Sequence, residues 1–367
     1  CFKNLERGLE ARRAREGDAF TAYDGYVPRA GEDEDPTGEG GSVLSARRLE
    51  TLGRCPMEYF FRYILKIEPP EEYKATPGAW LEPNEKGSLL HAVFREFMSR
   101  VSGRGVLPEY DRDIGLLEEV LEGRIASLKA EKPPPGAEEF EHERRELLET
   151  ARIFLREEEE YCRTARPAYF EAAIGVPPEE AGTALDTPDP VKIELPGGKR
   201  VRARGKIDRV DEVAGSGGTM FQVWDYKTGS SYAYDRADPF KGGRRVQNAL
   251  YLALVESRLG EVHPGAEAVA FGYFFPGVRE QGERIRWTRA ELDGYGRLIE
   301  RLCRMAAGGC FPFSNDKEDA DHSDYRSAFC DAAAAATAVD RKLRNEGNTA
   351  MAAFRELRGI EVGNGTG

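Results

Sequence analysis

The sequence predicts an α/β domain in which a central mixed β-sheet is flanked by helices. Up to residue 166 the apolar residues mostly recur with helical spacing, whereas residues 168–227 contain strand-like segments. A helix-like, a strand-like and another helix-like segment then follow one another. This order of helices, three strands, helix, strand and helix is typical of a mixed sheet covered by helices.

The N-terminal segment is the least regular part of the sequence. Residues 16–43 are rich in Gly, Pro, Asp and Glu and show no hydrophobic period, so we expect residues 1–43 to be a linker or a poorly ordered arm. Ordered structure should begin at Ser45, a good N-cap for a first helix. The segment 55–65 that follows is dense in aromatic residues, and we expect it to be buried.

Three further helices are predicted before residue 166. The first covers residues 87–101, where four apolar residues share one helical face: Leu90, Phe94, Phe97 and Val101. Residues 114–130 and 138–165 look like two more amphipathic helices, separated by three prolines at 133–135. We assign residues 102–166 to a helical insertion in the α/β core.

The second half of the chain supplies the sheet and further helices. Strands are predicted over residues 168–176, 199–213, 220–227 and 266–275, and helices over residues 246–259 and 289–307. The glycine-rich loop at 214–218 would join the second and third strands as a hairpin. The Ala-rich end favours helix, so residues 331–367 are expected to be a helical tail of a domain that spans 44–367.

Composition limits the classes of protein that fit. The 367 residues include no run of about 18 apolar residues and no secretory signal, so we expect no membrane span. Six scattered cysteines without a Cys-x-x-Cys pair fit a reducing cytoplasm better than a disulfide framework. The chain does not begin with Met, from which we expect a fragment of a longer polypeptide.

The net charge of −12 is unfavourable for a nucleic-acid binder, but the local field around a site matters more than the total. Acidic runs at 32–35 and 157–160 lie away from the motif described next. Basic residues cluster near it, at 199–209 and 241–245. Each of these clusters could equally be a solvated surface.

Two predicted strands carry the residues best suited to chemistry. Asp208 follows Gly205-Lys206-Ile207, and Asp225 and Lys227 stand two apart on the next strand. Side chains alternate along a strand, so Asp225 and Lys227 share a face, and a hairpin would place Asp208 beside Asp225. Two carboxylates can hold Mg²⁺, which activates water, and a lysine can stabilise the transition state. The alternative for Asp225 and Lys227 alone is a surface salt bridge that contributes about 0–1 kcal/mol.

Further motifs occur in a fixed order along the chain. They are Ser45, Leu49 and Cys55-Pro56 with the aromatic residues 59–61, Gly87-Ser88-Leu89-Leu90-His91, Glu171, Asp208, Asp225-x-Lys227, and Gln247-Asn248-Ala249-Leu250-Tyr251. With these motifs, residues 45–330 resemble the nuclease domain of the helicase–nuclease family that includes RecB and AddB, in the PD-(D/E)XK superfamily. The resemblance implies a restriction-endonuclease-like core.

The resemblance also implies roles for individual residues. The metal ligands would be His91, Asp208, Asp225 and the backbone carbonyl of Tyr226, and the metal would be Mg²⁺ or Mn²⁺. The other catalytic residues would be Lys227, Glu171, Gln247 and Tyr251. Two alternatives stay open: Glu171 could bind or position the metal or pair with an arginine, and the Gln247–Tyr251 face could contact the DNA backbone or support Lys227.

The chain departs from the family at the four-cysteine iron–sulfur cluster that many AddB-like nucleases carry. Cys55 matches the first expected ligand and Cys330 the last, but the middle two are missing. A cluster of this type needs four thiolates, so we predict that no intact cluster forms. Both cysteines would then be small buried residues, and His322 could join a degenerate site.

Together these observations predict an Mg²⁺-dependent deoxyribonuclease module that acts on single-stranded DNA in the cytoplasm. No Walker A motif is present, so any ATP-driven motor would lie in a partner helicase subunit or a helicase domain elsewhere. One alternative is a catalytically inactive DNA-binding or scaffolding domain that keeps the fold. Another is a free-standing exonuclease, which the missing Met and the trailing helix make less favoured.

Overall fold

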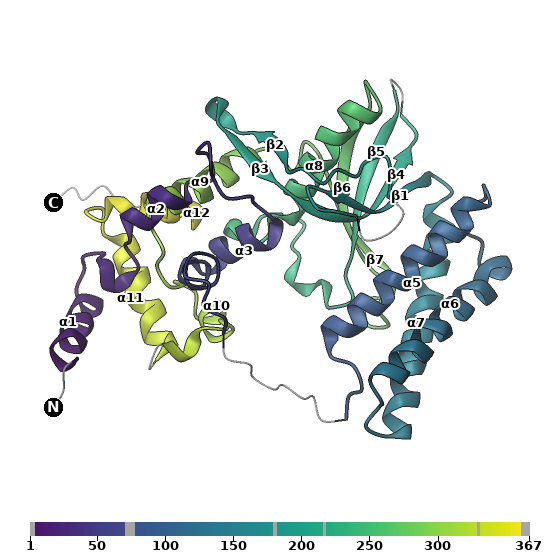
Figure 1. The fold of residues 1–367 in the computed structure, drawn as a ribbon, viewed down its shortest axis with the longest axis horizontal. Coiled ribbons are helices and arrows are strands. Elements are labelled where there is room, and N and C mark those ends of the chain that lie inside the picture. Colours follow the sequence, from purple (N-terminus) through teal and green to yellow (C-terminus); the bar gives the residue numbers. More distant parts are fainter. Residues whose placement is uncertain (1–3, 70–77, 179–181, 216–217, 329–330, 361–367) are drawn as a thin grey trace.

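The computed structural model describes residues 4–69, 78–178, 182–215, 218–328 and 331–360. Its centre is a five-stranded sheet with the strand order β1-β4-β5-β6-β7 (Figure 1). The strands are β1 (Ala165–Ile174), β4 (Gly205–Val213), β5 (Met220–Tyr226), β6 (Glu267–Phe275) and β7 (Glu283–Thr288). Strands β5 and β6 are parallel and the other neighbours are antiparallel, which confirms the mixed sheet.

Helices cover both faces of this sheet (Figure 1). Alternate residues of β5 enter two separate cores, because successive side chains on a strand point to opposite faces. Trp224 packs with α5 (Pro83–Gly103), α6 (Tyr110–Glu131) and α7 (Ala137–Tyr161). Val223 packs on the other side in a core that includes α3 (Ala46–Arg54), α8 (Gln247–Val262) and α9 (Tyr295–Ala307).

The predicted helical segments before the sheet are present. The four residues that define the apolar face of α5 are all buried, which confirms the helical period: Leu90, Phe94, Phe97 and Val101. Helices α6 and α7 lie within the predicted insertion at 102–166 and pack against each other beside α5 (Figure 1). The proline run at 133–135 falls between them, as expected.

The predicted strand over 199–213 was wrong as a single element. It divides at Arg204 into β3 (Arg200–Ala203) and β4, and β3 pairs only with β2 (Val191–Glu194) in a separate two-stranded sheet. The break arises because Arg204 donates its backbone N–H to the carbonyl of Leu44, 2.9 Å away, instead of continuing the ladder. Strands β2 and β7 were not predicted, because they are short elements of four and six residues.

The N-terminal segment differs from the expected arm. Helices α1 (Leu5–Glu16) and α2 (Pro28–Glu34) form there, and α2 packs against α9. Asp24 is buried and forms an ion pair with Lys342, with 2.6 Å between Oδ1 and Nζ. Contacts with the far end of the chain therefore order a segment whose own sequence shows no hydrophobic period.

The C-terminal region is helical, as predicted, within its described residues. It contains α11 (Ala332–Arg344) and α12 (Ala352–Leu357), preceded by α10 (Lys317–Asp321). The expected helix at 289–307 begins only at Tyr295, because β7 ends at Thr288 and a turn intervenes. Among the described residues, none of the helices has the length and apolar character needed to cross a bilayer.

Candidate active site

The β4–β5 hairpin places the two predicted aspartates side by side. Arg209 pairs with Trp224 in the antiparallel ladder, so the next rung brings Asp208 beside Asp225. Asp208 Oδ2 accepts a hydrogen bond from the backbone N–H of Tyr226 at 2.8 Å. Both carboxyl groups are nearly buried, with Asp208 9% and Asp225 3% exposed. The geometric prediction from strand alternation is therefore confirmed.

His91 reaches the same point from helix α5. Its Nδ1 lies 3.4 Å from Asp208 Oδ2, and its Nε2 lies 3.1 Å from the carbonyl oxygen of Tyr226. Burial disfavours the charged imidazole, but the carboxylates of Asp208, Asp225 and Glu171 outweigh it and raise the pKa of His91 to about 9. The same histidine keeps the pKa of Asp208 below its usual value, although burial acts in the opposite direction.

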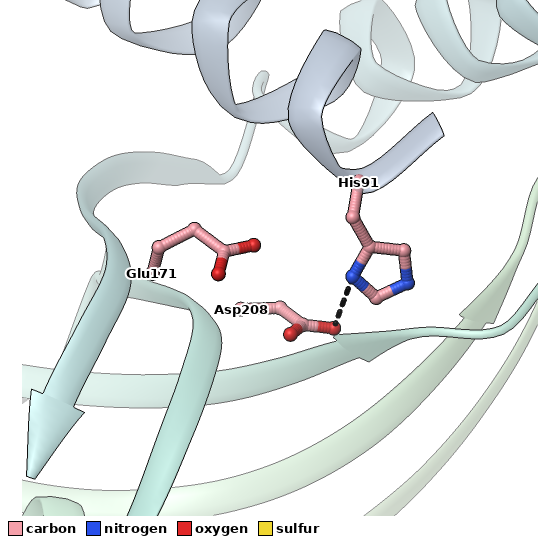
Figure 2. A group of neighbouring side chains, drawn as sticks. All are labelled: His91, Glu171 and Asp208. Atoms are coloured by element: carbon pink, nitrogen blue, oxygen red, sulfur yellow. Dashed lines mark ion pairs between the residues drawn. The ribbon is translucent and has the colours of Figure 1, made fainter. Parts of the chain in front are cut away.

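Glu171 completes a compact group of possible metal ligands. On strand β1 it occupies the rung between Phe170–Arg209 and Ala172–Ile207, opposite Asp208. One ligand atom from each of His91, Glu171 and Asp208 lies within 4.8 Å of the others. Figure 2 shows the three side chains directed toward one another.

The backbone at Glu171 is strained. Its φ of 52° is in the left-handed region, which costs a residue with a Cβ about 1–3 kcal/mol. Its Oε2 lies 3.0 Å from Lys206 Nζ, so the ion pair is with a lysine and not with the arginine considered from the sequence. Burial and the neighbouring Asp208 raise the pKa of Glu171. Strain at a carboxylate that points into a cluster of ligands is typical of a functional residue.

Asp225 is placed differently from the other predicted ligands. Its Oδ2 lies 2.6 Å from Lys227 Nζ, and its Oδ1 accepts a hydrogen bond from Gln247 Nε2 at 2.6 Å. Burial raises the pKa of Asp225 to about 7, and Lys227 offsets this only in part. Asp225 is not in the 4.8 Å group, so its role as a ligand stays a prediction.

Helix α8 fixes the lysine, as one of the two alternatives for the Gln-x-x-x-Tyr motif suggested. Gln247 Oε1 accepts a hydrogen bond from Lys227 Nζ at 2.9 Å. Burial disfavours the ammonium, but Asp225 outweighs it and the pKa of Lys227 is raised, which keeps the lysine charged. Tyr251 lies one turn along α8, where burial and the Asp225 carboxylate raise its pKa.

Gly205 allows α8 to approach this closely. A Cβ at Gly205 would lie 2.9 Å from the Tyr251 ring and 3.0 Å from Leu254, closer than side chains normally pack. The glycine three residues before Asp208 is therefore required by packing between β4 and α8.

The site opens into a cleft of about 870 Å³. Its lining includes His91, Glu171, Asp208 and Lys227, together with Lys206. The donor set suits a divalent cation: an imidazole and carboxylate oxygens converge, with a backbone carbonyl beside them. Apart from its ion pair with Lys227, the buried Asp225 Oδ2 accepts no hydrogen bond from the described residues, which also fits a cation in the vicinity.

Sequence analysis missed Glu50 on α3. Its Oε1 accepts hydrogen bonds from the backbone N–H groups of Val246 (2.8 Å) and Gln247 (3.0 Å) and so caps α8 at the site. One signal was available: α8 has no capping side chain at its own N-terminus, and the free N–H groups there need an acceptor from elsewhere.

Arg209 does not contribute to a basic surface, contrary to the expectation for residues 199–209. It is buried between Glu158 of α7 and Asp211, and its Nη1 lies 3.3 Å from the Tyr226 hydroxyl. Tyr226 in turn supplies the amide and carbonyl that contact Asp208 and His91. The arginine therefore supports the site from the side of α7.

The region expected to hold remnants of an iron–sulfur cluster is only partly described. Cys55 is buried, and burial raises its pKa to about 11, as expected of a small neutral core residue. Cys330 lies outside the described residues. His322 is exposed, with Nδ1 2.8 Å from the Glu318 carbonyl. The prediction that no cluster forms stays a prediction.

The fold and the site define a nuclease class, and comparison with known families agrees. The chain belongs to the PD-(D/E)XK nuclease superfamily, whose family model matches residues 43–335. This confirms the resemblance inferred from the ordered motifs.

Individual relatives narrow the family, and each is an AddB subunit of an ATP-dependent helicase/deoxyribonuclease. The chain is 30% identical over 258 residues to the AddB of Carboxydothermus hydrogenoformans, covering 69% of this chain and 22% of that protein. It is 26% identical over 309 residues to the AddB of Lactobacillus delbrueckii subsp. bulgaricus, covering 81% of this chain and 25% of the relative. The Clostridium tetani AddB is 26% identical over 230 residues, which cover 61% and 18% of the two chains. The match thus spans about a quarter or less of each relative.

Proposed function

We propose that this chain is a divalent-metal-dependent deoxyribonuclease module that hydrolyses phosphodiester bonds of single-stranded DNA. The observation that supports this most directly is the convergence of His91, Glu171 and Asp208 in one cleft that also holds Lys227. A domain that kept only the fold would be expected to have lost part of such a set.

The ligands of the proposed metal are residues of the hairpin and of α5. His91 and Asp208 would bind it, with Asp225, Glu171 and the Tyr226 carbonyl as further oxygen donors. Since oxygen donors outnumber the single imidazole, Mg²⁺ or Mn²⁺ fits better than a softer metal. When bound, such a cation lowers the pKa of a coordinated water and neutralises charge on the phosphoryl oxygens.

Lys227 supplies a fixed positive charge beside the ligands. Asp225 and Gln247 hold its ammonium, so little reorganisation is needed when negative charge develops on the phosphate. The lysine can also orient an attacking water by donating a hydrogen bond to it. Tyr251 and Lys206 would contact the strand or support these groups from the cleft wall.

The wider context rests on the relatives. Their name joins a helicase to a deoxyribonuclease, and the match covers about a quarter or less of their length. We therefore infer that the module works with a helicase subunit or domain that delivers DNA to the cleft. Cytoplasmic location follows from that role and is part of the proposal.

Hydrolysis of a 5′-labelled single-stranded oligonucleotide tests the proposal. We expect cleavage with Mg²⁺ or Mn²⁺ and none in EDTA. Asp208→Ala and Lys227→Ala should each lower kcat by about 10²–10³-fold, since each removes a charge that acts on the transition state. The matched controls Asp189→Ala and Lys192→Ala change exposed residues and should keep the wild-type rate.

Calorimetric titration with Mn²⁺ separates the enzyme from an inactive scaffold. The wild type should bind the ion and Asp208→Ala should bind it much more weakly. Absence of both ion binding and cleavage would favour the scaffold. Full activity of Lys227→Ala would remove the lysine from the mechanism.

A further inference from the structure

A second cavity, rich in arginine, lies beside the active-site cleft. Its volume is about 260 Å³, and the arginines that line it are Arg47, Arg54, Arg62, Arg244 and Arg245. They come from α3 and its C-terminal extension and from the segment just before α8. The cavity is therefore built from the same elements that hold Glu50 and Gln247 in place.

The arginines of this cavity differ in how far their charge is compensated. Arg54 pairs with Glu58 at 2.9 Å and Arg62 pairs with Asp324 at 2.5 Å, while Arg244 pairs with Asp316 and Asp319. Within the part of the chain that the structure describes, no carboxylate pairs with Arg47 or Arg245. Glu50 also lines the cavity, but its Oε1 is engaged by the N-terminus of α8.

Unsatisfied donors gather at the same cavity. The Nε atoms of Arg54, Arg62 and Arg245 are buried and have no hydrogen-bond acceptor among the described residues. A buried donor without an acceptor is unfavourable, and the cost is larger for a charged group. Three such guanidinium groups around one cavity call for a ligand with several anionic oxygens, and a phosphate has this character.

The cavity is continuous with the catalytic cleft. Arg47 lines both spaces, and Glu50, one turn further along α3, contacts the backbone of Gln247. Gln247 touches both Lys227 and Asp225. A strand with one phosphate at the catalytic group can thus pass along α3 with its backbone facing the arginines.

We propose that the arginine cavity binds a backbone phosphate of the single-stranded DNA whose scissile phosphate lies at Asp208 and Lys227. Arg47 and Arg245 supply the uncompensated charge, and Arg54 and Arg62 supply the unsatisfied Nε donors. The inference rests on the proposed function and deepens it, because it gives the strand a second anchoring point.

Binding and its salt dependence test the inference without cleavage. Fluorescence anisotropy would follow a 5′-fluorescein (dT)₁₅ strand with Ca²⁺ in place of Mg²⁺, over a series of KCl concentrations. Arg47→Ala and Arg245→Ala should each raise Kd about tenfold, the effect of losing one charged hydrogen bond. Each should also reduce the slope of log K against log salt by about 0.7, the value for one phosphate contact on a single strand.

Two variants serve as controls. Arg29→Ala removes an exposed arginine of α2 that does not line the cavity, and its Kd and salt slope should equal those of the wild type. Arg47→Lys keeps the charge and should keep most of the slope. Wild-type affinity and slope in both Arg47→Ala and Arg245→Ala would overturn the inference, as would failure of the wild type to bind the strand.

A short substrate separates this inference from the proposed function. Thymidine 5′-(p-nitrophenyl phosphate) has a single phosphate and cannot occupy both the catalytic site and the cavity. The arginine variants should hydrolyse it at the wild-type rate and show about a tenfold higher KM on (dT)₁₅. Equal losses on both substrates would assign the arginines to the fold of the catalytic site. An inactive wild type that still binds (dT)₁₅ through these arginines would refute the nuclease assignment alone.

Discussion

Replacement of Arg209 by methionine should destabilise the chain strongly, although the residue lies in none of the surface sites. Its guanidinium is 1% exposed and forms ion pairs with Glu158 and Asp211. Glu158 has a second cation, because Arg284 Nη2 lies 3.0 Å from its other oxygen. Asp211 is fully buried, and Arg209 is its cationic partner in the described ion pairs.

The expected loss follows from this arrangement. Methionine restores the volume of the side chain stem but leaves the Asp211 carboxylate buried without a cation. Breaking a buried ion pair in this way costs about 3–5 kcal/mol, a large part of the roughly 5–15 kcal/mol by which domains are stable. Because neither partner is exposed to solvent, the value needs no reduction for screening.

Urea titration followed by circular dichroism measures the free energy of unfolding. Arg163→Met is the matched control: its ion pair with Glu160 is on the surface, with the arginine side chain 65% exposed, and the change should be below about 0.5 kcal/mol. Adding Asp211→Asn to Arg209→Met should recover at least half of the loss, since the buried charge is then absent. A loss below about 1 kcal/mol in Arg209→Met would refute the reasoning.

Three other predictions concern the same region. First, the deficit of Arg209→Met should depend on pH: burial already raises the pKa of Asp211, so its protonated form is favoured in the folded state, and the variant should lose stability as pH rises from about 4 through that raised pKa, as urea titrations at about pH 4 and pH 8 would show. Second, Glu171→Gln should raise the Mg²⁺ concentration for half-maximal cleavage by about tenfold or more, because a ligand or its support is lost; an unchanged requirement would remove Glu171 from the metal site. Third, Gln247→Ala frees the lysine ammonium that it holds and should lower kcat about tenfold with little change in KM; the reverse pattern in steady-state kinetics would indicate a role in strand binding.

The parts of the fold that were predicted correctly depend on local periodicity. The apolar face of α5 follows from a spacing of three and four residues, and the β4–β5 hairpin follows from alternation and a glycine-rich loop. The same period of two placed Asp225 and Lys227 on one face. Local periods therefore predict the centre of the candidate site as well as the elements that carry it.

The parts that were missed depend on partners distant in the sequence. The division between β3 and β4 needs the Leu44 carbonyl, and the ordering of the N-terminal segment needs Lys342, which lies 318 residues from Asp24. The cap that Glu50 provides for α8 spans 196 residues to Val246. Propensity and period carry no information on such contacts, and tertiary interactions override them.

The acidic balance of the chain is compatible with DNA binding because many of the charges are paired internally. In the acidic run 157–160, Glu158 lies buried with Arg209, and Glu157 and Glu160 pair with Arg284 and Arg163. These carboxylates are therefore largely neutralised, and so are the arginines that pair with them.

The charges that a DNA strand would meet are the ones left without partners. Arg47 is exposed, lines both the cleft and the arginine cavity, and has no ion pair among the described residues. Screening limits the reach of exposed charges to about 8–10 Å at physiological salt, so distant carboxylates contribute little to the field at the cleft. The net charge of −12 therefore says less about nucleic-acid binding than the pairing state of two arginines beside α3 and α8.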